Sequence, residues 1–225
     1  MRKLLYVPII HVGSDLGSIA PDIDKRSTQI CGIERWERHK QTVSTFWDNI
    51  EKYFKKLNAD NLKIYQDGLM TDGELGLKII EEGAQKESKN YRIIVDLIRR
   101  GGEIRKTEDI ALLKEEYNRI LKLSQSKSIW ERTSAYIGYR FHKDRLMMKR
   151  DKFIAGTINQ TLKKKETGVL FIGAYHDVIP LLAEDIVVEE LKKTKKVREY
   201  FKELIFGKDE ERFEKLAKYL VTNDQ

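Results

Sequence analysis

The chain has 225 residues, 35% of them charged and 40% hydrophobic, a balance typical of a globular protein that folds in water. Its single cysteine, Cys31, excludes an internal disulfide framework, so we expect a reducing, cytoplasmic location. The sequence contains no run of about 18 apolar residues and no small-residue cleavage site after its apolar start, so we expect neither a membrane span nor a signal peptide. The length fits one domain, residues 1–225.

The net charge of +7 comes from one segment, residues 140–165, which has nine basic and two acidic residues. One interpretation is a basic face for an anionic partner such as nucleic acid. The other is a solvated helix with a few arginines turned inward. We favour the second, because no recognisable nucleic-acid motif accompanies the charges.

The first half of the chain predicts strands and helices in turn. Residues 3–10 are almost all apolar, as expected of a strand covered on both faces. Residues 43–57 have helical apolar spacing, and residues 61–67 predict a second strand. Ser88 can cap a helix that runs to Ile98 and stops before two glycines.

The second half continues the alternation. It predicts a weak strand at 103–106, a helical region at about 128–164, the strongest strand at 168–174 and an edge strand at 186–191, followed by two amphipathic helices. The alternation predicts an α/β fold with a mainly parallel central sheet flanked by helices, in which a long basic helical segment precedes the last core strand.

Four predicted strands end at titratable side chains. These are His11 with Asp15, Asp67, Glu108 with Asp109, and His176 with Asp177. Ligands of parallel α/β sheets bind outside the carboxyl ends of the strands. If the strands are parallel neighbours, these groups therefore meet at one rim of the sheet.

Two chemistries and one structural alternative fit these residues. A divalent metal ion, of a kind that the sequence does not identify, could be bound by His11, Asp15, Asp67, Glu108 and His176, and it would activate a water. Without a metal, a histidine could act as general base while Arg150 stabilises developing negative charge. Alternatively, the histidines only bond nearby turns and the acids only cap helices.

The chain also resembles a known family. The resemblance rests on the N-terminal strand that ends in histidine, a middle strand that ends in an acid, "KRDKFIAGTI" at 149–158 and "GVLFIGAYH" at 168–176. This combination is similar to the TraB/GumN/TIKI group, related to erythromycin esterase and ChaN-like proteins. The resemblance implies hydrolase chemistry at the strand ends, since members include metal-dependent peptidases and an esterase. The matched positions are His11, Asp67, Arg150, Asp151, Gly173 and His176.

The sequence departs from the family at two positions, with "VPIIH" in place of an opening Gly-x-x-His and Asp67 in place of a glutamate. The leading expectation is a hydrolase of an amide, ester or phosphoester in a small molecule or peptide, metal-assisted or histidine-based. Its expected catalytic residues are His11, Asp67, Arg150 and His176. The alternative is a non-catalytic module that binds an anionic small molecule or nucleic acid.

Overall fold

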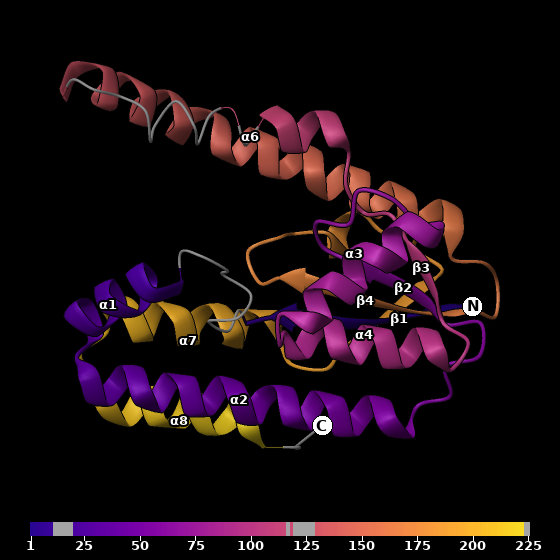
Figure 1. The fold of residues 1–225 in the computed structure, drawn as a ribbon, viewed down its shortest axis with the longest axis horizontal. Helices are drawn as coiled ribbons and strands as arrows, with labels where there is room; N and C mark the ends of the chain where they lie inside the picture. The colour runs from indigo at the N-terminus through magenta and orange to yellow at the C-terminus, as the bar shows by residue number, and fades with distance from the viewer. Residues whose placement is uncertain (11–19, 116–117, 119–128, 223–225) are drawn as a thin grey trace.

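The computed structural model describes the backbone of residues 1–10, 20–115, 118 and 129–222, and the side chains of these residues except 20–23 and 129–143. In this part of the chain five strands form one sheet in the order β3-β2-β4-β1-β5, and every neighbouring pair is parallel. The predicted α/β fold with a parallel central sheet is confirmed (Figure 1).

The strands are β1 (Arg2–Ile9), β2 (Lys63–Gln66), β3 (Glu103–Arg105), β4 (Thr167–Gly173) and β5 (Ile186–Glu190). The helices are α1 (Ala20–Cys31), α2 (Ile33–Lys56), α3 (Gly73–Gln85), α4 (Lys89–Arg99), α6 (Ile129–Thr161), the short η2 (Ile179–Leu181), α7 (Thr194–Phe206) and α8 (Glu210–Val221). All five predicted strands are present, and β5 lies at an edge as expected.

Alternating side chains of the strands supply two hydrophobic cores, one on each face of the sheet. On one face Leu5, Val7 and Phe171 pack with residues of α2, α4, α7 and α8. On the other face Tyr6 and Leu170 pack with the C-terminal half of α6. Figure 1 shows this layering, with α6 on one side of the strands and α2 and α8 on the other. Both faces are therefore covered, which accounts for the nearly continuous apolar runs of β1 and β4.

The helices agree only in part with the predictions. Ser88 caps α4 by accepting a hydrogen bond from the backbone of Tyr91. The predicted helix at 43–57 is too short at its start, because α2 begins at Ile33. The charged first half of α2, which the prediction left out, also buries His39. Neither α1 nor α3 was predicted, and the long helical region is the single helix α6.

The described part of the basic segment fits the solvated-helix interpretation. Arg145, Lys149 and Lys152 lie exposed along α6, whereas Arg150 turns toward the sheet. No described helix is both long enough and apolar enough to cross a membrane.

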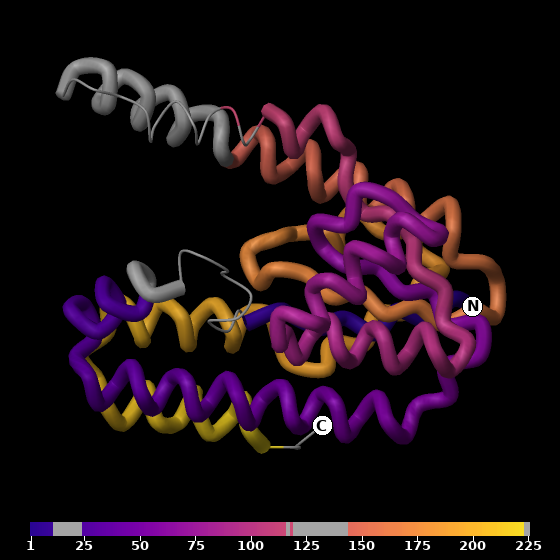
Figure 2. Tube along the Cα trace, viewed as in Figure 1, coloured from indigo at the N-terminus to yellow at the C-terminus, as the bar shows by residue number. Residues whose placement is uncertain are grey.

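The parallel arrangement places the carboxyl ends of β2, β3, β4 and β1 at one edge of the sheet. Segments that are far apart in the chain lie side by side in the sheet. Figure 2 shows the indigo β1 among the orange and yellow C-terminal segments. The predicted rim of strand ends is thus formed, although His11 and Asp15 lie outside the described residues.

Candidate functional site

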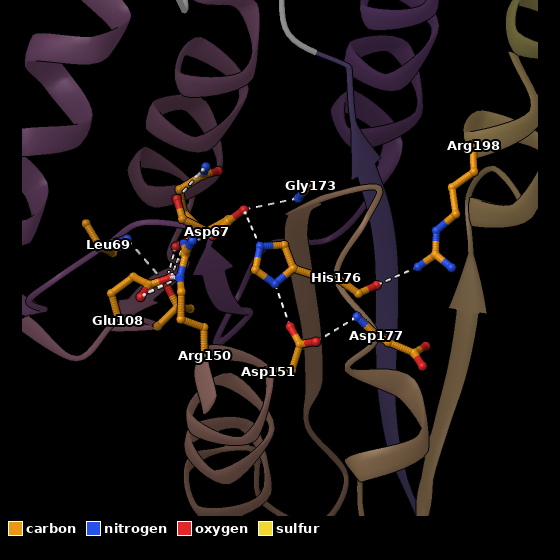
Figure 3. Close-up of polar contacts among 11 residues, drawn as sticks. Asp67, Leu69, Glu108, Arg150, Asp151, Gly173, His176, Asp177 and Arg198 are labelled. Atoms are coloured by element: carbon orange, nitrogen blue, oxygen red, sulfur yellow. Dashed lines mark hydrogen bonds and ion pairs between the residues drawn. The ribbon is translucent and has the colours of Figure 1, made fainter. Parts of the chain in front are cut away.

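Five charged side chains form a connected cluster at this carboxyl edge (Figure 3). Three of them follow strands: Asp67 follows β2, Glu108 follows β3 and His176 follows β4. The other two, Arg150 and Asp151, are neighbours on α6. Consecutive helical residues point about 100° apart, so one turn of α6 places side chains on two sides of the cluster.

His176 lies between two carboxylates. Its Nδ1 is 2.5 Å from Oδ1 of Asp151, and its Nε2 is 3.4 Å from Oδ2 of Asp67. The other oxygen of Asp151 accepts a hydrogen bond from the backbone N–H of Asp177, at 3.0 Å. Asp151 therefore fixes both the ring and the backbone that follows it.

Arg150 joins the other two acids. It donates through Nη2 to Asp67, at 3.1 Å, and to Glu108, at 2.6 Å, and its Nε also bonds Glu108. The Glu108 side chain is 0% exposed, whereas that of Asp67 is 16% exposed. Asp67 therefore links the histidine and arginine halves of the cluster and is its most solvent-accessible acid.

The cap alternative for the two acids is wrong. The Asp67 side chain bonds Arg150, His176 and the backbone N–H of Gly173. Glu108 bonds Arg150, and it is Asp109 that accepts from the backbone of Ala111, in the helical stretch that residues 110–115 form. Of the two adjacent acids, Glu108 thus pairs with a charge and Asp109 caps the helix.

A buried polar network supports the loop that carries Asp67. Asn90 donates to the side chain of Gln66, at 2.9 Å. Thr107 donates to the backbone carbonyl of Gln66 and accepts from the backbone of Leu69. These bonds fasten the end of β2 to the end of β3 and thereby fix where Asp67 meets Arg150.

The cluster changes the proton affinities of its members. Burial disfavours a charged His176, but its bonds to Asp151 and Asp67 outweigh burial and raise its pKa to about 9. Burial also opposes ionisation of Asp67, yet His176, Arg150 and the Gly173 N–H lower its pKa to about 2. For Glu108 burial dominates over Arg150, so its pKa is raised. At neutral pH, therefore, His176 is an imidazolium beside ionised Asp67.

As arranged, the described candidates do not fit a divalent metal ion. Metal ligation needs a free imidazole nitrogen, but both nitrogens of His176 face carboxylates. Arg150 lies between Asp67 and Glu108 where a cation would bind them. Among the described residues no group of three or more His, Cys, Asp or Glu side chains is placed to hold a metal. The predicted ligands His11 and Asp15 fall outside this part of the chain.

His39, on α2, has a structural role in the core. Its Nδ1 is 2.9 Å from the hydroxyl of Tyr200, and burial lowers its pKa to about 4. It is therefore a neutral core residue.

One residue of the site was missed from the sequence. Arg198, on α7, donates to the backbone carbonyls of Ala174 and His176. It stands in a helix rich in charges, and no local pattern distinguishes it from the neighbouring lysines.

The fold and cluster define the chain as a parallel α/β protein with a charged site at the carboxyl edge of its sheet. No protein-family model, curated protein or solved structure matches the chain. The similarity to the TraB/GumN/TIKI group therefore stays a prediction.

Proposed function

We propose that this protein is a hydrolase that cleaves an amide, ester or phosphoester bond in a small molecule or peptide. The observation that carries the proposal is the position of His176, held by Asp151 on one nitrogen and facing the partly exposed Asp67 with the other. A carboxylate that fixes one imidazole nitrogen leaves the second nitrogen oriented for proton transfer. The proposed family resemblance supports the same chemistry.

The proton inventory suggests the role of each group. The raised pKa gives His176 a proton to donate, so its Nε2–H protonates the departing oxygen or nitrogen. Asp67 accepts a hydrogen bond from the attacking water and takes its proton. That proton then passes to the nearby Nε2 of His176, which restores the imidazolium. Both partners end the cycle as they began it.

Arg150 supports this cycle by charge. Its guanidinium helps to keep Asp67 ionised and stabilises negative charge that develops on the substrate. Paired hydrogen bonds from a planar guanidinium to Glu108 fix its orientation, and a lysine cannot reproduce them. Arg150→Lys should therefore lose activity even though it keeps the positive charge.

The metal-assisted form of the proposal is tested separately, because it needs His176 and Asp67 to exchange their present partners for the ion. Activity that survives exhaustive chelation supports the metal-free proton cycle. Activity that is lost on chelation and restored by one divalent ion supports the metal-assisted form. A metal titration of the His176→Gln variant then shows whether that histidine is a ligand.

A direct test compares the two buried histidines. Wild type, His176→Gln and the control His39→Gln would be assayed on p-nitrophenyl acetate, alanine p-nitroanilide and p-nitrophenyl phosphate. Loss of a general acid costs about 100-fold to 10,000-fold in rate. We expect that loss in His176→Gln alone, after correction for the folded fraction. Equal activity of the two variants would remove the case for hydrolysis at this site.

Two neighbouring acids provide a second comparison. Asp151→Asn removes the anion that holds the His176 ring, whereas Asp177→Asn changes an exposed residue whose backbone alone joins the cluster. We expect Asp151→Asn to lower kcat by about 100-fold or more and Asp177→Asn to leave it within about twofold. The measurement is the steady-state rate on the best substrate of the panel, and the reverse order of effects would contradict the assignment.

The alternative function, binding of an anionic small molecule or nucleic acid, is favoured by one observation, the exposed row of Arg145, Lys149 and Lys152 on α6. Contacts of these residues with phosphates would make the affinity fall steeply with salt. Steep salt-dependent binding that Lys149→Glu with Lys152→Glu abolishes, in a protein that hydrolyses none of the substrates, would favour this alternative.

A further inference from the structure

The turn that carries His176 is held from several sides. In this turn the N–H of His176 donates to the carbonyl of Gly173, at 3.1 Å. Asp67 accepts from the N–H of Gly173, at the start of the turn, and Asp151 accepts from the N–H of Asp177, just after it. The same two acids contact the His176 ring, so the position of this backbone determines how the ring meets them.

Arg198 holds the turn from the opposite side. Its Nη2 donates to the carbonyl of His176, at 2.8 Å (Figure 3). Its Nε donates to the carbonyl of Ala174, at 2.5 Å. The two carbonyls flank Tyr175, so one planar guanidinium spans the turn with two charge-assisted bonds. Its neighbour Val197 is fully buried, which anchors α7 in the core.

We infer that Arg198 is a positioning residue, which fixes the backbone of His176 so that the imidazole is held at Asp151 and Asp67. The role of this residue in catalysis rests on the proposed hydrolase function, whereas its effect on the ring does not. The ring contacts come from Asp151 on α6 and from Asp67, just after β2, and the two backbone bonds come from Arg198 on α7. The position of the ring therefore depends on three elements. The bond to Asp151 is short and the approach to Asp67 is long, which makes proton transfer sensitive to a small shift.

Arg100 offers a matched control. Its Nη1 and Nη2 also donate to two backbone carbonyls, those of Leu57 and Phe54, each at 2.9 Å. It lies just before β3, at the amino edge of the sheet and therefore away from the site. Arg100→Met and Arg198→Met thus each remove two guanidinium–carbonyl bonds while keeping a long apolar stem, and Arg100→Met also removes an ion pair with Asp96 of α4.

The experiment has one readout that does not depend on activity. In proton NMR the Nδ1–H of His176, bonded to Asp151, should give a downfield signal that His176→Gln removes. We expect Arg198→Met to move this signal upfield or abolish it, because the hydrogen bond lengthens. Arg100→Met should leave the signal in place while lowering the unfolding temperature.

The kinetic readout separates positioning from general loss of stability. We expect Arg198→Met to lower kcat by about 10-fold to 100-fold with little change in KM, whereas Arg100→Met keeps both. Arg198→Lys, which can bond one carbonyl at a time, should give an intermediate effect and decides the matter if the methionine variant does not fold. A wild-type Nδ1–H signal in both Arg198 variants would overturn the inference. If wild type hydrolyses none of the substrates, the hydrolase proposal fails, and the NMR signal still decides the role of Arg198.

Discussion

His176 is buried between carboxylates, and its protonation therefore contributes to folding as well as to the proposed chemistry. Removing one partner of a buried charge pair typically costs about 3–5 kcal/mol, because the other charge is left uncompensated. Its side chain is only 5% exposed, so we expect a His176 substitution to lower the free energy of unfolding more than the substitution of an exposed histidine would. Loss of stability in a His176 variant is consequently no argument against catalysis, and the rate and the NMR signal must decide.

The charge of His176 predicts how stability depends on pH. Its pKa is raised in the folded protein, from 6.5 to about 9, so the folded state holds the proton more tightly. The resulting stabilisation, up to about 3 kcal/mol, is fully present below pH 6.5 and is lost as the pH rises through 9. Asp67 is coupled to the same proton, so its own shift is not added to this figure.

Urea unfolding of wild type and His176→Gln over this pH range measures the effect. We expect the free energy of unfolding to fall toward alkaline pH in wild type and to fall much less in the variant. Parallel pH profiles for the two proteins would show that His176 does not hold the extra proton.

Some residues of the site could be predicted from the sequence, and others could not. Asp67, Glu108 and His176 are predictable because each follows a strand, and parallel strands bring their carboxyl ends together. The family resemblance added Asp151. The pairing within the cluster was not predictable, since it depends on distances between strand ends. The role of Arg198 could not be predicted, because it bonds backbone carbonyls, and every residue type has a backbone carbonyl.

At the scale of elements, α6 places two charged residues by means of an apolar stripe. Ile154 and Ile158 of α6, and Leu162 just after its end, are spaced by four residues and are buried against the sheet. This stripe sets the rotation of the helix about its axis, and the rotation sends Arg150 toward Asp67 and Glu108 and Asp151 toward His176. The stripe was visible in the sequence, and so the divergence of the two side chains was predictable.

Shortening one residue of the stripe should affect both stability and the site. Ile158 is 0% exposed, so we expect Ile158→Ala to cost about 2–5 kcal/mol of unfolding free energy. Because the helix can then shift, kcat should also fall in the folded fraction. Gln160→Ala, two residues along on the exposed side, is the control and should change stability by less than about 0.5 kcal/mol. Urea unfolding and steady-state rates measure these effects, and an unchanged kcat in folded Ile158→Ala would show that the stripe does not set the site.

The helical segments that the sequence analysis did not predict include α3 and the first half of α2, whose buried faces are narrow or polar. In α3 only Gly76 and Ile80 are buried, so its helical period is weak in the sequence. The first half of α2 buries His39 and Thr42, which an apolar pattern does not count. Tertiary contacts decide such segments, whereas β1 and β4 have enough apolar residues to be recognised locally.

At the scale of the whole molecule, the sheet ties the two ends of the chain together. Leu5 of β1 is opposite Val169 of β4 and Glu189 of β5, so the first strand lies inside the sheet while its partners come from the last third of the chain. Helix α8, near the C-terminus, lies alongside α2 (Figure 2). Any cut of the described chain between β1 and β5 separates β1 from at least one of its two partner strands, because β1 pairs with β4 and β5.

This interleaving predicts one cooperative unfolding transition for residues 1–225, as expected of a single domain. Leu5→Ala in β1 and Leu220→Ala in α8 each truncate a fully buried side chain, and each should cost about 2–5 kcal/mol. Since both residues belong to one hydrophobic core, either variant should shift the whole transition to lower temperature. The exposed Lys215→Ala on α8 should leave it in place. In calorimetry the van't Hoff and calorimetric enthalpies should agree. Two separate transitions, of which Leu220→Ala moved one and Leu5→Ala the other, would instead show that the N-terminal strand and the C-terminal helix belong to units that fold independently.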